Sequence, residues 1–386
     1  MEKQYLQEKA RFEEKQEIVE TQFIADNVDE SLLDMTFKEF TFSEKGNSDE
    51  GLLFSRLPKN KSGNNYALNT INLLRKATRV INSEEYNFFN KKRLVEISTE
   101  DAEQLVEELR KRRKTVNKAE GIYEQISNTM VQKYINDLKI VFNALESTVK
   151  LRKKGTNPFS GMTAGTIKHK KDGKTSLDTI EEYDKVKEEL KSMVTDEPDD
   201  ALFFLFAMIS MLRRGETAAL TWDNLNFEDK TISINGVIEE DNHLNKIYYR
   251  KYTKSDEVRL SIMNNELMEI LKSLKSKYEN RYWTDDRGIK HNLIFLDKDG
   301  NPDKLTHWTN AWSKKFRPKL QKQGLIKKQT TLHDLRGSGI SYYLIEKKLD
   351  VTVLARIVGH SDIAMILNVY ANATDNNIRQ LAKEID

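Results

Sequence analysis

Six polar side chains in the C-terminal half of the chain have the types needed to act on a phosphodiester; they are Arg213, Lys254, His333, Arg336, His360 and Tyr370. An arginine guanidinium matches two phosphate oxygens and stays charged, so a pair of arginines suits an anionic, pentavalent transition state. A tyrosine hydroxyl attacks phosphorus when a neighbour shares its proton, and a lysine can protonate the departing 5′ oxygen. Because arginines can stabilise the developing charge alone, we predict no metal and no cofactor.

Each of these residues also has a structural interpretation. Arg213 could pair with Glu216, three residues later, or cap a helix, and Arg214 is an adjacent competitor for its role. His333 and Arg336 are spaced to share one helix face and could form a structural pair.

The remaining candidates have structural alternatives too. We predict Lys254 in the turn of a hairpin, where it could be a solvated lysine. His360 follows a glycine and could be a polar group at a helix end, whereas Tyr370 could be a half-buried core residue. Tyr342 and Tyr343 lie in the same region, and we interpret both as packing residues.

The composition bounds the kind of protein. The chain has 386 residues, 38% hydrophobic and 32% charged, which allows two or three domains with real cores. It has no cysteine, which excludes disulfides, thiolate metal sites and a cysteine nucleophile. Its longest apolar run, Ala201 to Leu212, is too short to span a bilayer and predicts a buried helix. The charged N-terminus does not resemble a signal peptide, so we expect an intracellular protein without membrane contact.

The charge distribution is uneven although the net charge is only +2. Residues 1–50 contain 14 acids against 6 Lys and Arg, whereas residues 110–174 contain 16 Lys and Arg against 5 acids. The surplus of 16 − 5 = 11 positive charges would suit a phosphate backbone. Solvated helix faces are the alternative explanation.

Elements that would carry these residues can be placed along the chain. Residues 31–160 are predicted to be mostly helical. Ser98 and Asp101 have capping-box spacing. A later helix has one apolar face, made of Val131, Ile135, Leu138, Phe142 and Leu145. The basic stretch Lys150 to Lys174 is predicted to be exposed, with the linker proper at 161–174.

Residues 175–370 have a mixed pattern. The runs "KTISING", "KIYYRKY" and "EVRLSI" predict a small antiparallel sheet between helical segments. Asp350 is predicted to cap a helix that Gly359 ends. The fold class is therefore mainly α with a small antiparallel sheet.

The order and spacing of the six residues resemble the catalytic signature of the tyrosine recombinases, the phage integrase family. The boxes "RRGETAALTWDNL", "LHDLRGSGIS" and "IVGHSDIAMILNVYAN" carry the likeness. It covers residues 175–386, and residues 31–160 resemble, more loosely, the family's helical core-binding domain. The family commonly has glycine where this chain has Met211, and we expect that position to be governed by packing.

The resemblance implies a site-specific DNA integrase of a mobile genetic element, with a mixed α+β catalytic domain. It implies a core-type DNA-binding domain at 31–160, the basic linker, a catalytic domain at 175–370 and a tail at 371–386 that packs on a neighbouring subunit. Residues 1–30 depart from the family, because their acidic sequence predicts a helical extension where many members have a basic, strand-rich arm-binding domain. The implied partners are double-stranded DNA, further copies of the chain in a tetramer and an excision factor, in the bacterial cytoplasm.

The resemblance also assigns roles. Tyr370 would attack the phosphate to form a 3′-phosphotyrosyl bond, and Lys254 would be the general acid. Arg213 and Arg336 would hold the non-bridging oxygens, and Glu216 would orient Arg213. Proton transfer would fall to the first histidine, His333, and a phosphate hydrogen bond to His360. A Holliday junction would follow, without metal or ATP.

DNA contacts are expected from the helical domain. Asn128, Thr129 and Lys133 start an amphipathic helix and are our candidates for groove contacts, although the polar side chains could equally cap that helix. Lys153 and Lys154 are candidates for phosphate contacts.

Two other functions fit parts of the sequence. A type IB topoisomerase uses a similar residue set, but the short tail after Tyr370 favours a recombinase. A non-catalytic DNA-binding regulator derived from a recombinase would have no reason to keep the whole set.

Overall fold

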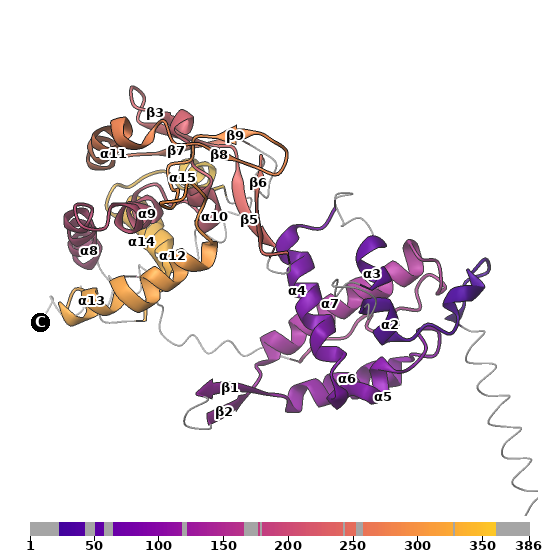
Figure 1. The fold of residues 1–386 in the computed structure, drawn as a ribbon. Coiled ribbons are helices and arrows are strands. Elements are labelled where there is room, and N and C mark those ends of the chain that lie inside the picture. The colour runs from indigo at the N-terminus through magenta and orange to yellow at the C-terminus, as the bar shows by residue number, and fades with distance from the viewer. Residues whose placement is uncertain are drawn as a thin grey trace, which may run out of the picture. The chain divides into compact units, whose positions relative to one another are not determined.

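The computed structural model describes residues 23–42, 51–57, 65–117, 122–165, 177, 180–241, 244–251, 258–326 and 329–359. The chain divides into two compact units, Met1–Lys170 and Lys171–Asp386 (Figure 1). Each unit has its own hydrophobic core.

The first unit is mainly helical. Its elements are η1 (Glu30–Leu32), α2 (Phe37–Thr41), α3 (Leu52–Ser55), α4 (Leu68–Ile81), η2 (Glu84–Tyr86), α5 (Asn87–Asn90), α6 (Thr99–Lys111), β1 (Arg113–Asn117), β2 (Ile122–Gln125) and α7 (Asn128–Ser147). The predicted apolar face of α7 is confirmed, because all five of its residues are buried. The predicted capping box is also confirmed: Ser98 and Asp101 satisfy each other's backbone N–H groups at the start of α6.

Three features of the first unit differ from the prediction. Strands β1 and β2 form an antiparallel hairpin inside a region predicted to be helical. Ile24 makes a β-bridge with Arg152, so residues 23–30 are not one helix. The stretch from Lys150 is not simply exposed, because Arg152 and Phe159 are fully buried. The Arg152 guanidinium donates to the carbonyls of Leu94 at 2.7 Å and of Ile97 at 3.0 Å, which binds this stretch to the core.

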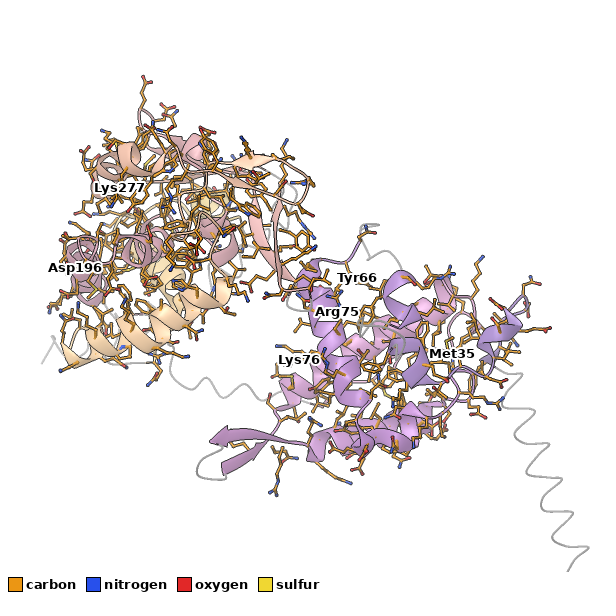
Figure 2. All side chains as sticks on the ribbon, viewed as in Figure 1. Met35, Tyr66, Arg75, Lys76, Asp196 and Lys277 are labelled. Carbon is orange, nitrogen blue, oxygen red and sulfur yellow. The ribbon has the colours of Figure 1, made fainter. Side chains whose placement is uncertain are left out.

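The second unit combines helices with small sheets. Its helices are α8 (Ile180–Met193), α9 (Pro198–Ile209), α10 (Arg214–Ala218), η3 (Trp222–Asn224), α11 (Asn265–Tyr278), α12 (Leu305–Ala311), η4 (Trp312–Phe316), α13 (Arg317–Lys322), α14 (Leu332–Ile345) and α15 (Val351–Val358). Its strands are β3 (Leu225–Asn226), β4 (Thr231–Ile234), β5 (Val237–Asp241), β6 (Lys246–Arg250), β7 (Arg259–Ile262), β8 (Trp283–Thr284) and β9 (Lys290–His291). Figure 2 draws the side chains and labels, among others, Arg75 and Lys76 on α4 and Lys277 on α11.

Helix α9 is the centre of the second unit, as its apolar sequence predicts. Every residue from Ala201 to Ile209 is buried. Helix α14 crosses it closely, because a Cβ atom on Gly339 would lie 2.0 Å from the carbonyl oxygen of Met208. The absence of a side chain at Gly339 therefore sets the distance between α9 and α14, the helix that carries His333 and Arg336.

The strands pair in an order that the sequence did not predict. Strands β3, β4 and β7 form one antiparallel sheet, β5 pairs only with β6, and β8 with β9. The strands on either side of Lys254, β6 and β7, therefore belong to different sheets, and the hairpin predicted there is wrong.

The predicted fold class is confirmed: the described residues are mainly helical, with small antiparallel sheets. No helix in the described ranges is long and apolar enough to cross a membrane.

Two glycines of α14 provide a matched test of this packing. We expect Gly339→Ala to lower the free energy of unfolding by about 1–3 kcal/mol, because the new methyl group must displace backbone. Gly337→Ala adds the same group where nothing lies within 4 Å. It should raise stability by roughly 0.4–1 kcal/mol through helix propensity and unfolded-state entropy. Urea denaturation of both variants measures the difference, and an unchanged stability for Gly339→Ala would contradict the close crossing.

Candidate active site

The start of α10 brings Arg213 and Glu216 together. The backbone N–H of Arg213 donates to Glu216 Oε2 at 2.8 Å, and the guanidinium Nη1 donates to Oε1 at 3.0 Å. The ion pair with Glu216 considered from the sequence is therefore present. It does not exclude a role in phosphate binding, because the Arg213 side chain remains 40% exposed.

Glu216 is a buried carboxylate, 3% exposed, surrounded by arginines. Arg259 on β7 donates to both of its oxygens, at 2.7 and 3.1 Å, and Arg336 Nη1 lies 4.0 Å from Oε2. Burial acts to raise the pKa of Glu216, but hydrogen bonding by Arg259, its charge and the contacts of Arg213 outweigh it and lower the pKa. The carboxylate is thus ionised and holds positive side chains from three elements.

Arg336 is almost fully buried, with its side chain 2% exposed. Its guanidinium donates to the carbonyl oxygens of Met211 and, at 2.8 Å, of Val358. Burial and the nearby charge of Arg213 lower the pKa of Arg336 to about 9, despite the opposing effect of Glu216. Arg336 is therefore still a cation at neutral pH, with its charge directed at backbone carbonyls.

The C-terminal end of α15 is the acceptor for much of this charge. Arg213 donates to the carbonyl of Gly359 at 2.9 Å and to that of Val358 at 3.4 Å. The last carbonyls of a helix have no partner within it and carry the negative end of its dipole. Guanidinium groups satisfy both needs, and they fix the chain immediately before His360.

His333 lies in the first turn of α14, three residues before Arg336. The residue is exposed, but the surrounding chain still removes part of the ring's hydration. This desolvation and the positive charges of Arg336 and Arg213 lower the pKa of His333, against the opposing charge of Asp334. The imidazole is therefore neutral near pH 7 and able to accept a proton.

Met211 corrects one expectation. Its backbone φ is +54°, in the left-handed region, and it directs its carbonyl at Arg336. The side chain is fully buried, in a small cluster with Ile340 and Leu354. Packing alone does not govern the position, because the left-handed backbone is what favours glycine there. Methionine adds apolar contacts but accepts a conformational cost of about 1–2 kcal/mol.

The competing residues have other contacts. Arg214 donates to Thr309 Oγ1 on α12 at 2.6 Å, so the contacts at the Glu216 carboxylate are made by Arg213 and not by its neighbour. Tyr342 stacks on Tyr183 with ring centroids 4.4 Å apart, and burial raises the pKa of Tyr343 to about 12. The packing interpretation of Tyr342 and Tyr343 is confirmed.

Three of the six candidates, Lys254, His360 and Tyr370, lie outside the described residues. Their neighbours in sequence are described. Helix α15 begins at its predicted cap, Asp350, and ends at Gly359 with φ +66°, which confirms both predicted ends.

The candidate DNA contacts of the first unit are all exposed: Asn128, Thr129, Lys133, Lys153 and Lys154. The hydroxyl of Ser127 caps α7 and accepts from the backbone N–H of Met130. The side chains of Asn128 and Thr129 are therefore not the cap of this helix.

The sequence analysis missed Arg259. It is the only charged residue in the apolar run "VRLSI", five residues after Lys254. Strand alternation was the available signal, since Val258 and Leu260 are 62% and 57% exposed, whereas the Arg259 side chain is 9% exposed.

Comparisons with known proteins agree with this arrangement. A protein-family model described as "Phage integrase family" matches residues 179–377, which are 199 of the 386 residues. A putative integrase/recombinase of Haemophilus influenzae is 29% identical over 168 residues, covering 43% of this chain and 35% of the relative. A XerC-like tyrosine recombinase of Caldanaerobacter subterraneus is 23% identical over 266 residues, covering 65% of this chain and 64% of the relative. The chain thus spans between about one third and two thirds of these curated relatives.

The fold has a counterpart among solved structures. The Tn1549 transposon integrase in complex with transposon right-end DNA is similar with a TM-score of 0.58 at 20% sequence identity. The similarity covers 82% of this chain and 95% of that one.

Two replacements of Met211 separate the conformational cost of its left-handed backbone from the stability that its side chain contributes by packing. We expect Met211→Ala to lower the free energy of unfolding by about 2–5 kcal/mol because buried apolar surface is removed. Met211→Gly should be less destabilising than Met211→Ala by roughly 1 kcal/mol, because glycine adopts the left-handed backbone freely. Chemical denaturation gives the comparison, and the usual order, with alanine the more stable, would refute the conformational explanation.

Proposed function

The chain belongs to the phage integrase family, and on that premise we propose that it is a site-specific DNA recombinase. It cleaves and rejoins DNA through a 3′-phosphotyrosyl intermediate, without metal or ATP. The observation that carries this proposal is the convergence of Arg213 and Arg336 on the buried carboxylate of Glu216, next to the chain that leads to His360. His333 lies near enough to both arginines for their charges to lower its pKa.

The chemistry follows from the charges. Arg213 has the exposed guanidinium, so it makes the first contact with a non-bridging phosphate oxygen. Arg336 adds a buried cation, whose field in a site of low dielectric stabilises the charge that grows at the transition state. Glu216 orients Arg213. Its single negative charge offsets only part of the positive charge of the surrounding arginines, so the cluster keeps a net positive charge that attracts phosphate.

Proton transfer is assigned to the residues around this cluster. Tyr370 is the nucleophile, and His333, neutral at pH 7, shares in the movement of its proton. Lys254 protonates the 5′ oxygen that leaves, and His360 hydrogen-bonds the phosphate. The phosphotyrosyl bond conserves the energy of the broken bond, so the 5′ hydroxyl of a second duplex reseals it after a Holliday junction.

The partners follow from the reaction. We propose that residues 31–160 act as a core-type DNA-binding domain, and that 161–174, 175–370 and 371–386 are linker, catalytic domain and tail. Strand exchange needs two duplexes, and hence a tetramer of the chain on DNA, with an excision factor setting direction. Bacterial and phage relatives support action in the bacterial cytoplasm as the integrase of a mobile element.

A covalent-adduct assay tests the proposal. Wild-type protein is mixed with labelled, nicked duplexes taken from the DNA that flanks the gene, and products are separated on a denaturing gel. We expect protein-linked DNA with wild type and none with Tyr370→Phe, because phenylalanine lacks the attacking oxygen.

The other outcomes are equally informative. Tight binding of these duplexes without any adduct would contradict a catalytic function and favour a DNA-binding regulator. An adduct that persists in Tyr370→Phe would place the nucleophile elsewhere. Adduct formation with supercoil relaxation, but no exchange between two duplexes, would favour a topoisomerase.

Phosphate binding by lysines of the first unit predicts that the affinity for DNA falls as the salt concentration rises. We expect Lys153→Gln with Lys154→Gln to weaken DNA binding and to lower the slope of log K against log salt by about 1 for each lysine that binds a phosphate. Fluorescence anisotropy in a salt series measures it. Lys272→Gln is the control, because this lysine already pairs with Glu269 at 3.1 Å in the second unit; an equal change in the control would refute specific phosphate binding.

A further inference from the structure

Arg259 is a charged side chain buried beside the proposed active site, with no role yet assigned. It begins β7, which pairs with β4 in antiparallel register. Its side chain is 9% exposed, whereas its neighbours Val258 and Leu260 point to solvent. The strand thus exposes apolar groups and buries a cation, the reverse of the usual arrangement. Burying a guanidinium is costly unless its donors are satisfied, so its partners indicate its purpose.

The partners of Arg259 come from two other elements. Two of its nitrogens donate to the two oxygens of Glu216 on α10, at 3.1 and 2.7 Å. Its Nε donates to the carbonyl of Ile357, at the end of α15, at 3.0 Å. One planar group therefore joins β7 to both α10 and α15, which a point-like ammonium could not do.

The turn after α15 rests directly on this guanidinium. A Cβ atom on Gly359 would lie 2.8 Å from Arg259 Nε, 2.9 Å from Cδ and 3.0 Å from Cζ. This close approach and the positive φ both require glycine at the turn. The next residue in the chain is His360.

Three arginines share the end of α15. Their acceptors are the successive carbonyls of Ile357, Val358 and Gly359. Arg213 uses part of its hydrogen-bonding capacity here and is proposed to contact phosphate, and Arg336 is proposed to act through its charge. The side chain of Arg259 is 9% exposed, against 40% for Arg213, and all three of its guanidinium nitrogens donate to protein acceptors.

We propose that Arg259 is a positioning residue for strand cleavage: by bridging the Glu216 carboxylate and the Ile357 carbonyl, it fixes Arg213 on one side and the turn before His360 on the other. This inference rests on the proposed recombinase function. Arg259 acts through its neighbours and does not touch DNA. Its removal should therefore slow the chemical step at saturating DNA and leave DNA affinity nearly unchanged.

Because this role depends on the negative charge of Glu216, it predicts that the effect of removing Arg259 on cleavage changes with pH. The groups that face Glu216 are Arg213 from the start of α10, Arg259 from β7 and Arg336 from α14. Without Arg259 the carboxylate loses its strongest partner while it stays buried, so its pKa rises. A protonated Glu216 no longer holds Arg213. The cleavage defect should therefore deepen as pH falls and shrink as pH rises.

The experiment compares single-turnover adduct formation on the nicked flanking duplex, and its binding by anisotropy, between pH 5.5 and 8.5. We expect Arg259→Met to slow cleavage about 100-fold at neutral pH, the scale of a misplacement of roughly 1 Å. Arg259→Lys should be intermediate, since it keeps the charge but cannot bridge. Arg259→Met combined with Glu216→Gln should add little to Glu216→Gln alone and lose the extra pH dependence, because both changes break one unit.

Arg250→Met is the matched control. Arg250 on β6 also pairs with a glutamate, Glu239, at 2.9 Å, but its side chain is 45% exposed. We expect it to cleave as wild type does. Arg259→Met cleaving at a rate near wild type would overturn the proposal. So would a defect that is independent of pH, additive with Glu216→Gln and accompanied by an equal decrease in DNA affinity, because it would reflect structure alone.

Amide hydrogen exchange tests the Arg259 bridge without any measurement of activity. If wild type forms no adduct with this duplex, the recombinase proposal fails, and Arg259 is judged by exchange in the free protein. Faster exchange at residues 354–359 in Arg259→Met, growing as pH falls after correction for intrinsic rates and absent from Arg250→Met, supports the bridge. Unchanged exchange overturns it.

Discussion

The buried carboxylate of Glu216 is the interaction on which the second unit's charged centre depends. Three guanidinium groups from α10, β7 and α14 surround it, and each would be repelled by the others in its absence. Removing one partner from a buried ion pair typically costs about 3–5 kcal/mol, since the remaining charge is left without compensation. The carboxylate therefore permits positive charge to be concentrated in a folded protein, where it can later serve a polyanion.

The C-terminal end of α15, which is the negative end of its dipole, also balances the charge of the arginines, through backbone carbonyls in place of a carboxylate. Helix C-termini present carbonyl oxygens without partners, and here the arginines supply the donors. One carboxylate and a set of backbone dipoles thus balance several cations. The net charge of the site stays positive, and the arginines are held in position before any ligand arrives, which lowers the reorganisation that a reaction would need.

Much of this was readable from the sequence because it depends on local rules. Capping residues and periodic apolar positions predicted α6, α7 and both ends of α15, and a continuous apolar run predicted α9. Spacing singled out Arg213, Glu216, His333 and Arg336. Interactions between distant segments left weaker signals. The bridging role of Arg259 depends on strand pairing across sheets, and the left-handed backbone at Met211 occurs at a residue type that normally avoids it. The β1–β2 hairpin lies in a charged stretch whose periodicity is too short to separate strand from helix.

The arginine hydrogen bonds at the end of α15 have a consequence for tolerance to substitution. Their acceptors are backbone carbonyls, which every residue type possesses, so side-chain changes at Ile357 or Val358 leave the acceptors chemically intact. Gly359 has no such freedom, because its left-handed backbone and the guanidinium packed against it exclude a Cβ atom. These hydrogen bonds therefore constrain the arginine donors and the terminal glycine, whereas the side chains of Ile357 and Val358 are constrained by their packing in the small apolar cluster and not by the hydrogen bonds.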